Sequence, residues 1–364
     1  MRYGEGLLAE IRQRTDLVAL VGRRVKLVRK PQVNAVLSER QKLRPFQRSL
    51  LSVVQKAEAA TAGRFFGGLP SGLRDLDSRL GGFRRSELIL LAGQSGMGAT
   101  SLALTIVANA LRTTRGVASL TDKADTTTPA IALFSFDMSS EQLARRILSS
   151  DTGIPLWKIT NGKFSEEEWE KFVLALQEYS AVPLLVAEGP MSVEQLCSQA
   201  AEMKKGADLK CVVVDGLQRL AAWTVDSSSM SNCERVVRRL KVLASELSVP
   251  VLVTSSLPVH SRDRKSPEPR MSDLSEYGAV ERFSDVVLLL YREFHRLKDI
   301  EPEVGTVEHV RWIEKLDRSY QRADIFIGKN RSESTVTIDF FFDDALGLFQ
   351  DLTVLTPSVS SSGD

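Results

Sequence analysis

Apolar runs without polar alternation recur along most of the chain, separated by stretches with helical spacing. We expect buried strands at residues 88–91, 129–138, 183–187, 210–218, 250–255, 285–291 and 323–328. Segments 101–110 and 233–247 predict helices, and another helix is expected to begin with Ser140 as its cap. Strands that are apolar on both faces and alternate with helices are typical of a parallel sheet covered on both sides. The pattern predicts an α/β fold with a mainly parallel central sheet.

A glycine-rich turn joins the first strand to the helix at residues 101–110. Glycines let successive backbone N–H groups converge on an anion, and the positive end of the following helix points at the same place. The strand–loop–helix pattern predicts a phosphate-binding loop, composed of Gly93, Gln94, Ser95, Gly96, Met97, Gly98, Ala99, Thr100 and Ser101. The Thr100 hydroxyl is a candidate ligand for a magnesium ion. A glycine-rich turn that binds nothing is the alternative.

This loop lacks the lysine that the motif places before its hydroxyl residue, because position 99 is alanine. A charge about 4 Å from the phosphates, at an effective dielectric near 20, contributes roughly 4 kcal/mol, or about three decades in affinity or rate. We expect nucleotide binding to survive in part and fast hydrolysis to be lost.

Two carboxylates follow predicted strands. Asp137 lies at the end of the run at 129–138, and Asp215 follows the apolar residues of the run at 210–218. Ligands of open α/β sheets bind outside the carboxyl ends of the strands. We therefore expect both carboxylates beside the glycine-rich loop, with Asp215 as a magnesium site.

Composition narrows the class of protein. The 364 residues are 43% hydrophobic and 26% charged, which is ordinary for a globular protein. No apolar run approaches the ~18–20 residues of a membrane span, and no signal-peptide core opens the chain. The three cysteines are widely spaced, and Cys211 opens an apolar strand, so a buried thiol is expected. A reducing, cytoplasmic setting without membrane contact follows as the expectation.

The amino-terminal segment is strongly basic. Residues 1–56 hold 13 Lys and Arg against 4 Asp and Glu, a net charge of +9, while the whole chain carries +2 and the remainder −7. Such an arm suits nucleic acid or an acidic partner, and a solvated tail is equally open. We divide the chain into a basic amino-terminal segment at 1–44, a linker helix at 45–63, the α/β domain at 64–352 and a disordered tail at 353–364.

Two features of the first 63 residues refine that division. The run Leu8–Leu27 resembles the opening of the zinc-binding domain of DnaG-type primases, but residues 31–40 contain neither Cys nor His, so no zinc site is expected. After Pro45, an apolar face of Phe46, Leu50, Val53, Val54 and Ala57 predicts an amphipathic helix. It would pack on its own domain or on a neighbouring subunit.

An ordered set of motifs from about residue 67 to 350 resembles the DnaB-type replicative helicases, whose motor domain is RecA-like. They include the phosphate loop, Gly68-Leu-Pro-Ser-Gly-Leu-Arg-Asp-Leu-Asp77, Phe134-Ser-Phe-Asp-Met-Ser-Ser-Glu-Gln142, Val212-Val-Val-Asp-Gly-Leu-Gln218, Asp273-Leu-Ser-Glu-Tyr-Gly-Ala-Val-Glu281 and Ile327-Gly-Lys-Asn-Arg331. The resemblance implies a RecA-like P-loop NTPase domain, ATP and Mg²⁺ as cofactors, single-stranded DNA as a partner, and a homo-hexamer or a place in a helicase ring. Contact with a primase or helicase loader is a further implication.

The resemblance also assigns roles by position. Asp215 would hold magnesium through water, and Asp137 stands where the family keeps a glutamate that activates the attacking water. Lys329 and Arg331 match the pair that reaches into the next subunit's ATP site, where a cation stabilises transition-state charge. Ordinary surface charge is the alternative for this pair.

Departures from the family pattern fall at the positions to which the resemblance assigns roles in ATP hydrolysis. Ala99 replaces the lysine, and Asp137 is one methylene shorter than glutamate, so a base could sit about 1 Å back and lose roughly a hundredfold in rate. Ser256 stands in place of a glutamine that senses the γ-phosphate, while Val259 and Ser275 stand in place of arginines. Whether the chain is an enzyme stays open on these grounds.

A polar loop at 258–270 follows a predicted strand, where the resemblance places the DNA-contacting loops of the ring. Its basic side chains would follow phosphates without reading bases, and they are Arg262, Arg264, Lys265 and Arg270. A solvated loop is the alternative.

Three functions remain open. The first is a DnaB-like helicase-domain protein that binds ATP and single-stranded DNA in replication, with weak or absent hydrolysis. The second is a non-catalytic adaptor that regulates an active helicase or primase. The third keeps full activity, with Arg84 or Arg85 in place of the missing lysine.

Overall fold

A computed structural model describes residues 50, 68–118, 129–180, 183–224, 231–258, 266–330 and 335–352. The chain divides into two units, Met1–Phe66 and Gly67–Asp364, and the central sheet with its covering helices belongs to the second. The helix and strand expected before residue 31, the helix expected from Pro45 and the tail after 352 lie outside the described residues, apart from Leu50, which is helical. None of the described helices is long and apolar enough to cross a membrane.

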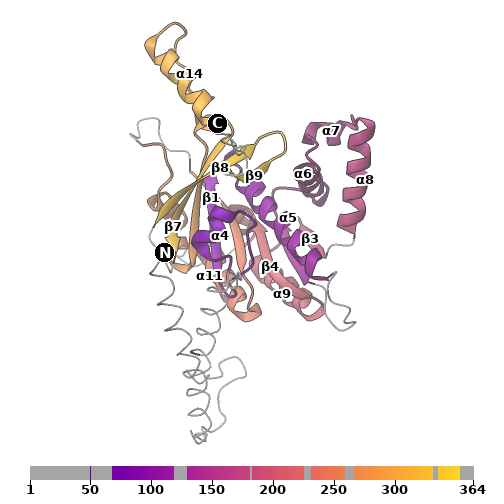
Figure 1. Cartoon of the computed structure of the whole chain (residues 1–364). Helices are drawn as coiled ribbons and strands as arrows, with labels where there is room; N and C mark the ends of the chain where they lie inside the picture. The colour runs from indigo at the N-terminus through magenta and orange to yellow at the C-terminus, as the bar shows by residue number, and fades with distance from the viewer. Residues whose placement is uncertain are drawn as a thin grey trace, which may run out of the picture. The chain divides into compact units, whose positions relative to one another are not determined.

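One nine-stranded sheet forms the centre of the second unit, in the order β3-β2-β4-β5-β1-β6-β7-β8-β9 (Figure 1). The strands from β3 to β6 in this order pair in parallel, and β7, β8 and β9 add an antiparallel edge. The strands are β1 (Leu88–Gln94), β2 (Pro129–Ser135), β3 (Leu184–Glu188), β4 (Asp208–Asp215), β5 (Val251–Leu257), β6 (Val286–Tyr291), β7 (Arg322–Asn330), β8 (Val336–Asp343) and β9 (Leu348–Asp351). The predicted mainly parallel α/β sheet is confirmed.

Helices cover both faces of this sheet, so residues of the central strands are buried on both sides. One core lies between the sheet and α4, α5 and α6, and the other between the sheet and α9, α10, α11 and α12. The helices are α4 (Arg74–Leu80), α5 (Ala99–Ala118), α6 (Ser140–Thr152), α7 (Leu156–Asn161), α8 (Glu166–Ser180), α9 (Val193–Gly206), α10 (Leu217–Trp223), α11 (Asn232–Leu247), the 3₁₀ helix η1 (Met271–Tyr277), α12 (Val280–Phe283), α13 (Glu293–Leu297) and α14 (Val307–Ser319).

Three details differ from the expectations. The cap of α6 is Ser139, not Ser140, because the Ser139 side chain accepts from the backbone N–H of Gln142 while the Gln142 side chain accepts from that of Ser139. Strand β2 ends at Ser135, so Asp137 lies in the following turn. Strand β4 ends at Asp215, and residues 217–223 form a helix after Gly216, whose φ of 111° favours glycine. Cys211 is buried as predicted, and burial raises the pKa of its thiol to about 12.

An ion pair joins the amino-terminal ends of β1 and β6 to α11. The Asp285 carboxylate is fully buried and accepts from the Leu88 backbone N–H at 2.7 Å and from Lys241 Nζ at 2.6 Å. The Lys241 ammonium also donates to the Ser86 carbonyl at 2.6 Å. These contacts fix the start of β1, the strand that leads to the glycine-rich loop.

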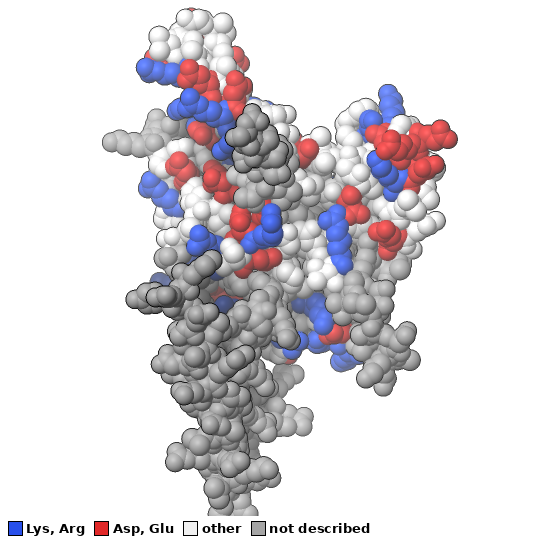
Figure 2. Space-filling view, viewed as in Figure 1, with Lys and Arg blue, Asp and Glu red and all other residues white. Residues whose placement is uncertain are grey.

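Two arms project from the sheet, one formed by α7 and α8 and the other by α14 (Figure 1). Acidic side chains gather on the first arm, where Glu166, Glu167 and Glu168 open α8 (Figure 2). Because DNA phosphates are negative, this arm is a poor candidate for DNA contact.

An acidic pair on the antiparallel edge makes stability depend on pH. Asp324 and Asp339 lie directly opposite each other on β7 and β8, and burial together with the Asp339 charge raises the pKa of Asp324 to about 6. The folded-state pKa exceeds the usual 3.8, so this contribution to stability is full below about pH 4 and is lost as pH rises through about 6.

We expect Asp339→Asn to raise the free energy of unfolding at pH 8 by about 1 kcal/mol after solvent screening, or about 1–2 °C in Tm. The reason is that Asp324 can then ionise without an opposing charge. Thermal melting between pH 4 and 8 measures this change, and the exposed Asp317→Asn on α14 is the control. Equal pH profiles for wild type and Asp339→Asn would contradict the prediction.

Candidate nucleotide site

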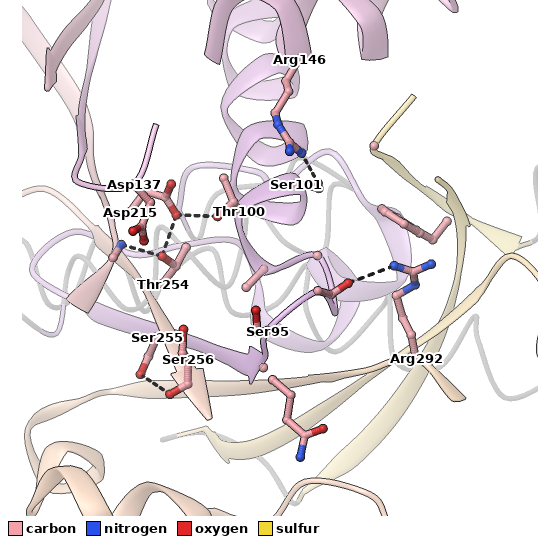
Figure 3. Close-up of a pocket in the computed structure, with 18 of the residues that line it drawn as sticks. Ser95, Thr100, Ser101, Asp137, Arg146, Asp215, Thr254, Ser255, Ser256 and Arg292 are labelled. Atoms are coloured by element: carbon pink, nitrogen blue, oxygen red, sulfur yellow. Dashed lines mark hydrogen bonds between the residues drawn. The ribbon is translucent and has the colours of Figure 1, made fainter. Parts of the chain in front are cut away.

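A polar cavity of about 430 Å³ lies at the carboxyl ends of β1, β4 and β5 (Figure 3). It is lined by every residue of the predicted loop except Met97, which is buried. Asp137 and Asp215 also line it. The loop and the two carboxylates predicted from the sequence therefore come together in one cavity.

The loop has the backbone shape of an anion cradle. Gly96 and Gly98 have φ angles of 82° and 99°, which residues with a Cβ rarely adopt. A Cβ on Gly96 would lie 2.3 Å from Nε2 of His295, so any other residue there would have to displace the imidazole. Helix α5 begins at Ala99 and points its positive end toward the cavity. This geometry fits the phosphates of a nucleotide.

Asp215 is the most buried carboxylate of the cavity, with 2% of its surface exposed. Its Oδ1 accepts from the hydroxyls of Thr100 and Thr254, each at 2.8 Å. Burial raises the pKa of the Asp215 carboxyl, and these two hydrogen bonds offset part of that rise. Its Oδ2 is buried and has no hydrogen-bond partner among the described residues. A carboxylate beside a threonine hydroxyl at the phosphate loop fits magnesium, which prefers oxygen ligands.

Asp137 lies at the edge of the cavity and is about half exposed. Its Oδ1 accepts from Nε of Arg219 on α10 at 2.8 Å. An exposed pair of this kind is worth about 0–1 kcal/mol, so it restrains the carboxylate only weakly. One oxygen of the candidate base is nevertheless directed at a cation of its own chain.

Two arginines that the sequence analysis did not single out also line the cavity, Arg146 and Arg292. Arg146 comes from α6 and lies 3.4 Å from the Ser101 hydroxyl. Arg292 follows β6 and is 3% exposed, with hydrogen bonds to the Gly96 carbonyl at 3.3 Å and to Asp344 at 2.6 Å. Burial lowers the pKa of Arg292. In Figure 3 its guanidinium lies on the other side of the loop from Asp215.

Arg84 and Arg85 do not line this cavity. They precede β1, whereas the loop follows it, and a seven-residue strand spans roughly 23 Å. Arg85 instead lines a second, smaller cavity with Lys204 and Lys210. The expectation that Arg84 or Arg85 replaces the missing lysine is therefore wrong, because the two residues lie at the end of β1 opposite the loop.

Of the remaining candidates, Ser256 alone among the described residues lines the cavity. Lys329 lies on β7 and donates to the Glu281 carbonyl at 2.6 Å, outside the cavity of its own chain. Arg270 is exposed just before η1. Arg262, Arg264, Lys265 and Arg331 fall outside the described residues. Ser256 lines the cavity, and its backbone N–H and carbonyl are both bonded to the Gln218 side-chain amide.

The sequence analysis did not predict Thr254 and Arg292 as residues of this cavity, although the sequence holds a signal for both. Thr254 lies near the carboxyl end of apolar strand β5, and Arg292 directly follows β6. Polar residues at the carboxyl ends of parallel strands are candidates for ligand contact in this class of fold.

Comparisons with known proteins agree on one family. A family model described as the DnaB-like helicase C terminal domain matches residues 68–351. The replicative DNA helicase DnaB of Rickettsia typhi is 31% identical over 286 residues, covering 78% of this chain and 57% of that protein. The corresponding protein of Helicobacter pylori is 27% identical over 307 residues, covering 79% and 60%. The chain thus spans somewhat more than half the length of these relatives.

Solved structures give the same result for the fold. A structure described as an ATPase domain superposes with a TM-score of 0.68 at 25% identity, covering 85% of this chain and 99% of that domain. A DnaB-like replicative helicase, described together with its interactions with primase, superposes with a TM-score of 0.66 at 24% identity and covers 85% of this chain and 68% of its own.

Proposed function

Because this chain belongs to the family of DnaB-like helicase C-terminal domains, we propose that it binds ATP with magnesium, and single-stranded DNA, but hydrolyses ATP slowly. The family model matches residues 68–351, and the similar proteins are replicative helicases. The domain is therefore a DnaB-like replicative helicase domain. The proposal concerns what this particular domain does, since its relatives are longer than the chain.

One observation carries the proposal: the cavity keeps the parts that bind and lacks the charge that aids hydrolysis. Glycines in left-handed backbone, Thr100 and Asp215 all line it. Ala99 is at the position of the lysine and offers no charge. Backbone N–H groups and the end of α5 can still hold phosphates, which supports binding.

The residues of the cavity would have different roles in ATP binding and hydrolysis. Thr100 and Asp215 would hold magnesium, which when bound neutralises phosphate charge. Asp137 would accept the proton of the attacking water, but its shorter side chain and its pairing with Arg219 place it poorly for that task. Lys329 and Arg331 would act on the ATP of a neighbouring subunit, which makes a hexamer or a mixed helicase ring the expected assembly.

Single-stranded DNA would contact the segment after β5. Arg262, Arg264, Lys265 and Arg270 supply positive charge there, which attracts phosphates without regard to sequence. The setting would be cytoplasmic replication, with a primase or a helicase loader as the expected class of protein partner.

The deciding experiment uses the whole chain. Calorimetric titration with ATP, in MgCl₂ and in EDTA, measures nucleotide binding, and fluorescence anisotropy with an oligo-dT strand measures DNA binding. Steady-state ATPase assays with that DNA measure turnover. We expect magnesium-dependent ATP binding, salt-sensitive DNA binding and turnover well below the ~10 s⁻¹ typical of enzymes. Absence of ATP binding, or turnover at that typical rate, would overturn the proposal.

An adaptor role is the second candidate, and Ala99 together with the basic segment at 1–56 favours it. Such a protein would regulate an active helicase or primase through its surface. It predicts that ATP fails to bind while the chain changes the activity of a purified replicative helicase.

A further inference from the structure

Thr254 lies near the end of β5 and is 4% exposed. Its hydroxyl donates to Oδ1 of Asp215 at 2.8 Å and accepts from the Gly216 backbone N–H at 2.9 Å (Figure 3). The donor and acceptor roles of the hydroxyl are therefore both fixed. The residue ties β5 to the end of β4 at the carboxylate proposed to hold magnesium.

This arrangement treats the two oxygens of the Asp215 carboxylate differently. Oδ1 accepts two hydroxyl protons, from Thr254 and Thr100, whereas Oδ2 has no partner among the described residues and is buried. A carboxylate can rotate about its last bond, because this torsion is broad and roughly two-fold. Two hydrogen bonds to the same oxygen hold the carboxylate in one orientation, and Thr254 supplies one of the two.

The two donors differ in what they do when metal binds. Thr100 is itself a candidate ligand, so its oxygen must turn a lone pair toward the ion. The Thr254 hydroxyl accepts from the Gly216 backbone N–H, and Thr254 is not a candidate ligand for the ion. Its bond to Asp215 is the one that needs no rearrangement.

We propose that Thr254 is a positioning residue that orients Asp215 to bind magnesium in the nucleotide cavity. The inference rests on the proposed nucleotide binding and deepens it. Groups that orient a metal's ligand alter metal affinity by about 10- to 100-fold when they are removed. Thr254 acts through Asp215 and does not itself contact the ion.

The test compares Thr254→Val, which removes the hydroxyl at nearly constant volume, with Thr254→Ser, which keeps it. Thr105→Val is the matched control, because Thr105 is a buried threonine of α5 whose hydroxyl accepts from the Phe349 N–H at 3.4 Å, outside the cavity lining. Each variant is titrated with MgCl₂ at fixed ATP and, separately, with ATP in EDTA. Thermal melting reports whether each variant is folded.

We expect Thr254→Val to raise about tenfold the MgCl₂ concentration that half-saturates the magnesium response of ATP binding. The affinity for ATP in EDTA should stay within about twofold of wild type. Thr254→Ser should retain the wild-type magnesium response, because its hydroxyl can make the same bonds. Thr105→Val should also retain it, even where its melting temperature falls.

Two results would overturn the inference. If Thr254→Val and Thr254→Ser respond equally to magnesium, the hydroxyl has no orienting role, and the proposed function stands. If Thr254→Val folds and keeps the wild-type response, the same conclusion follows. Wild-type ATP binding that is absent or indifferent to magnesium would instead remove the metal site from the proposed function, and this inference with it.

Discussion

Replacing Ala99 by lysine is expected to tighten ATP binding by about two to three orders of magnitude. The new ammonium would enter the cavity that Ala99 lines, beside the loop, and a charge about 4 Å from phosphate at an effective dielectric near 20 contributes roughly 4 kcal/mol. Because the lysine of this motif reaches the β- and γ-phosphates, the gain for ATP should exceed the gain for ADP. Calorimetric titration of both nucleotides in MgCl₂ measures the difference.

The uncharged Ala99→Met variant is the control, since it adds a flexible side chain of similar length without the charge. Equal affinities for Ala99→Met and Ala99→Lys would show that volume, not charge, matters. Ala99→Lys alone should leave turnover low, because Asp137 remains short and paired with Arg219. Turnover should rise when Ala99→Lys is combined with Asp137→Glu.

Replacing Lys241 by methionine is expected to lower the free energy of unfolding by about 3 kcal/mol. The change leaves the fully buried Asp285 carboxylate without its ammonium, and breaking a buried pair typically costs about 3–5 kcal/mol. We take the lower end because Lys241 is 24% exposed, so water can partly replace it. Urea unfolding followed by circular dichroism measures the change.

Lys205→Met is the matched control for this prediction. Lys205 pairs with Glu202, but both side chains are more than 70% exposed, so the change should be within about 0.5 kcal/mol. Similar losses for the two lysines would contradict the assignment of stability to the buried pair. Loss of the β1 anchor should also weaken ATP binding, since β1 positions the loop.

The local pattern of residues determined much of this protein. Apolar runs within β1, β4, β5 and β6 require burial on both faces, and a parallel sheet between helices is the structure that provides it. The glycines of the loop, the hydroxyl of Thr100 and the acid at Asp215 are local signals, so the cavity and its central residues could be predicted. The absence of lysine at position 99 was equally plain.

Tertiary structure alone decided what surrounds these residues. Thr254, Arg146 and Arg292 come from three other elements, and only the order of strands in the sheet brings them to one cavity. Arg84 and Arg85 are closer to the loop in sequence, but they lie at the opposite end of β1 from it. The apolar pattern of a segment shows that it forms a buried strand, because burial is a local requirement. Which strand ends lie side by side depends on long-range pairing. The orientation of Asp215 depends on the same pairing, because Thr254 reaches it from β5.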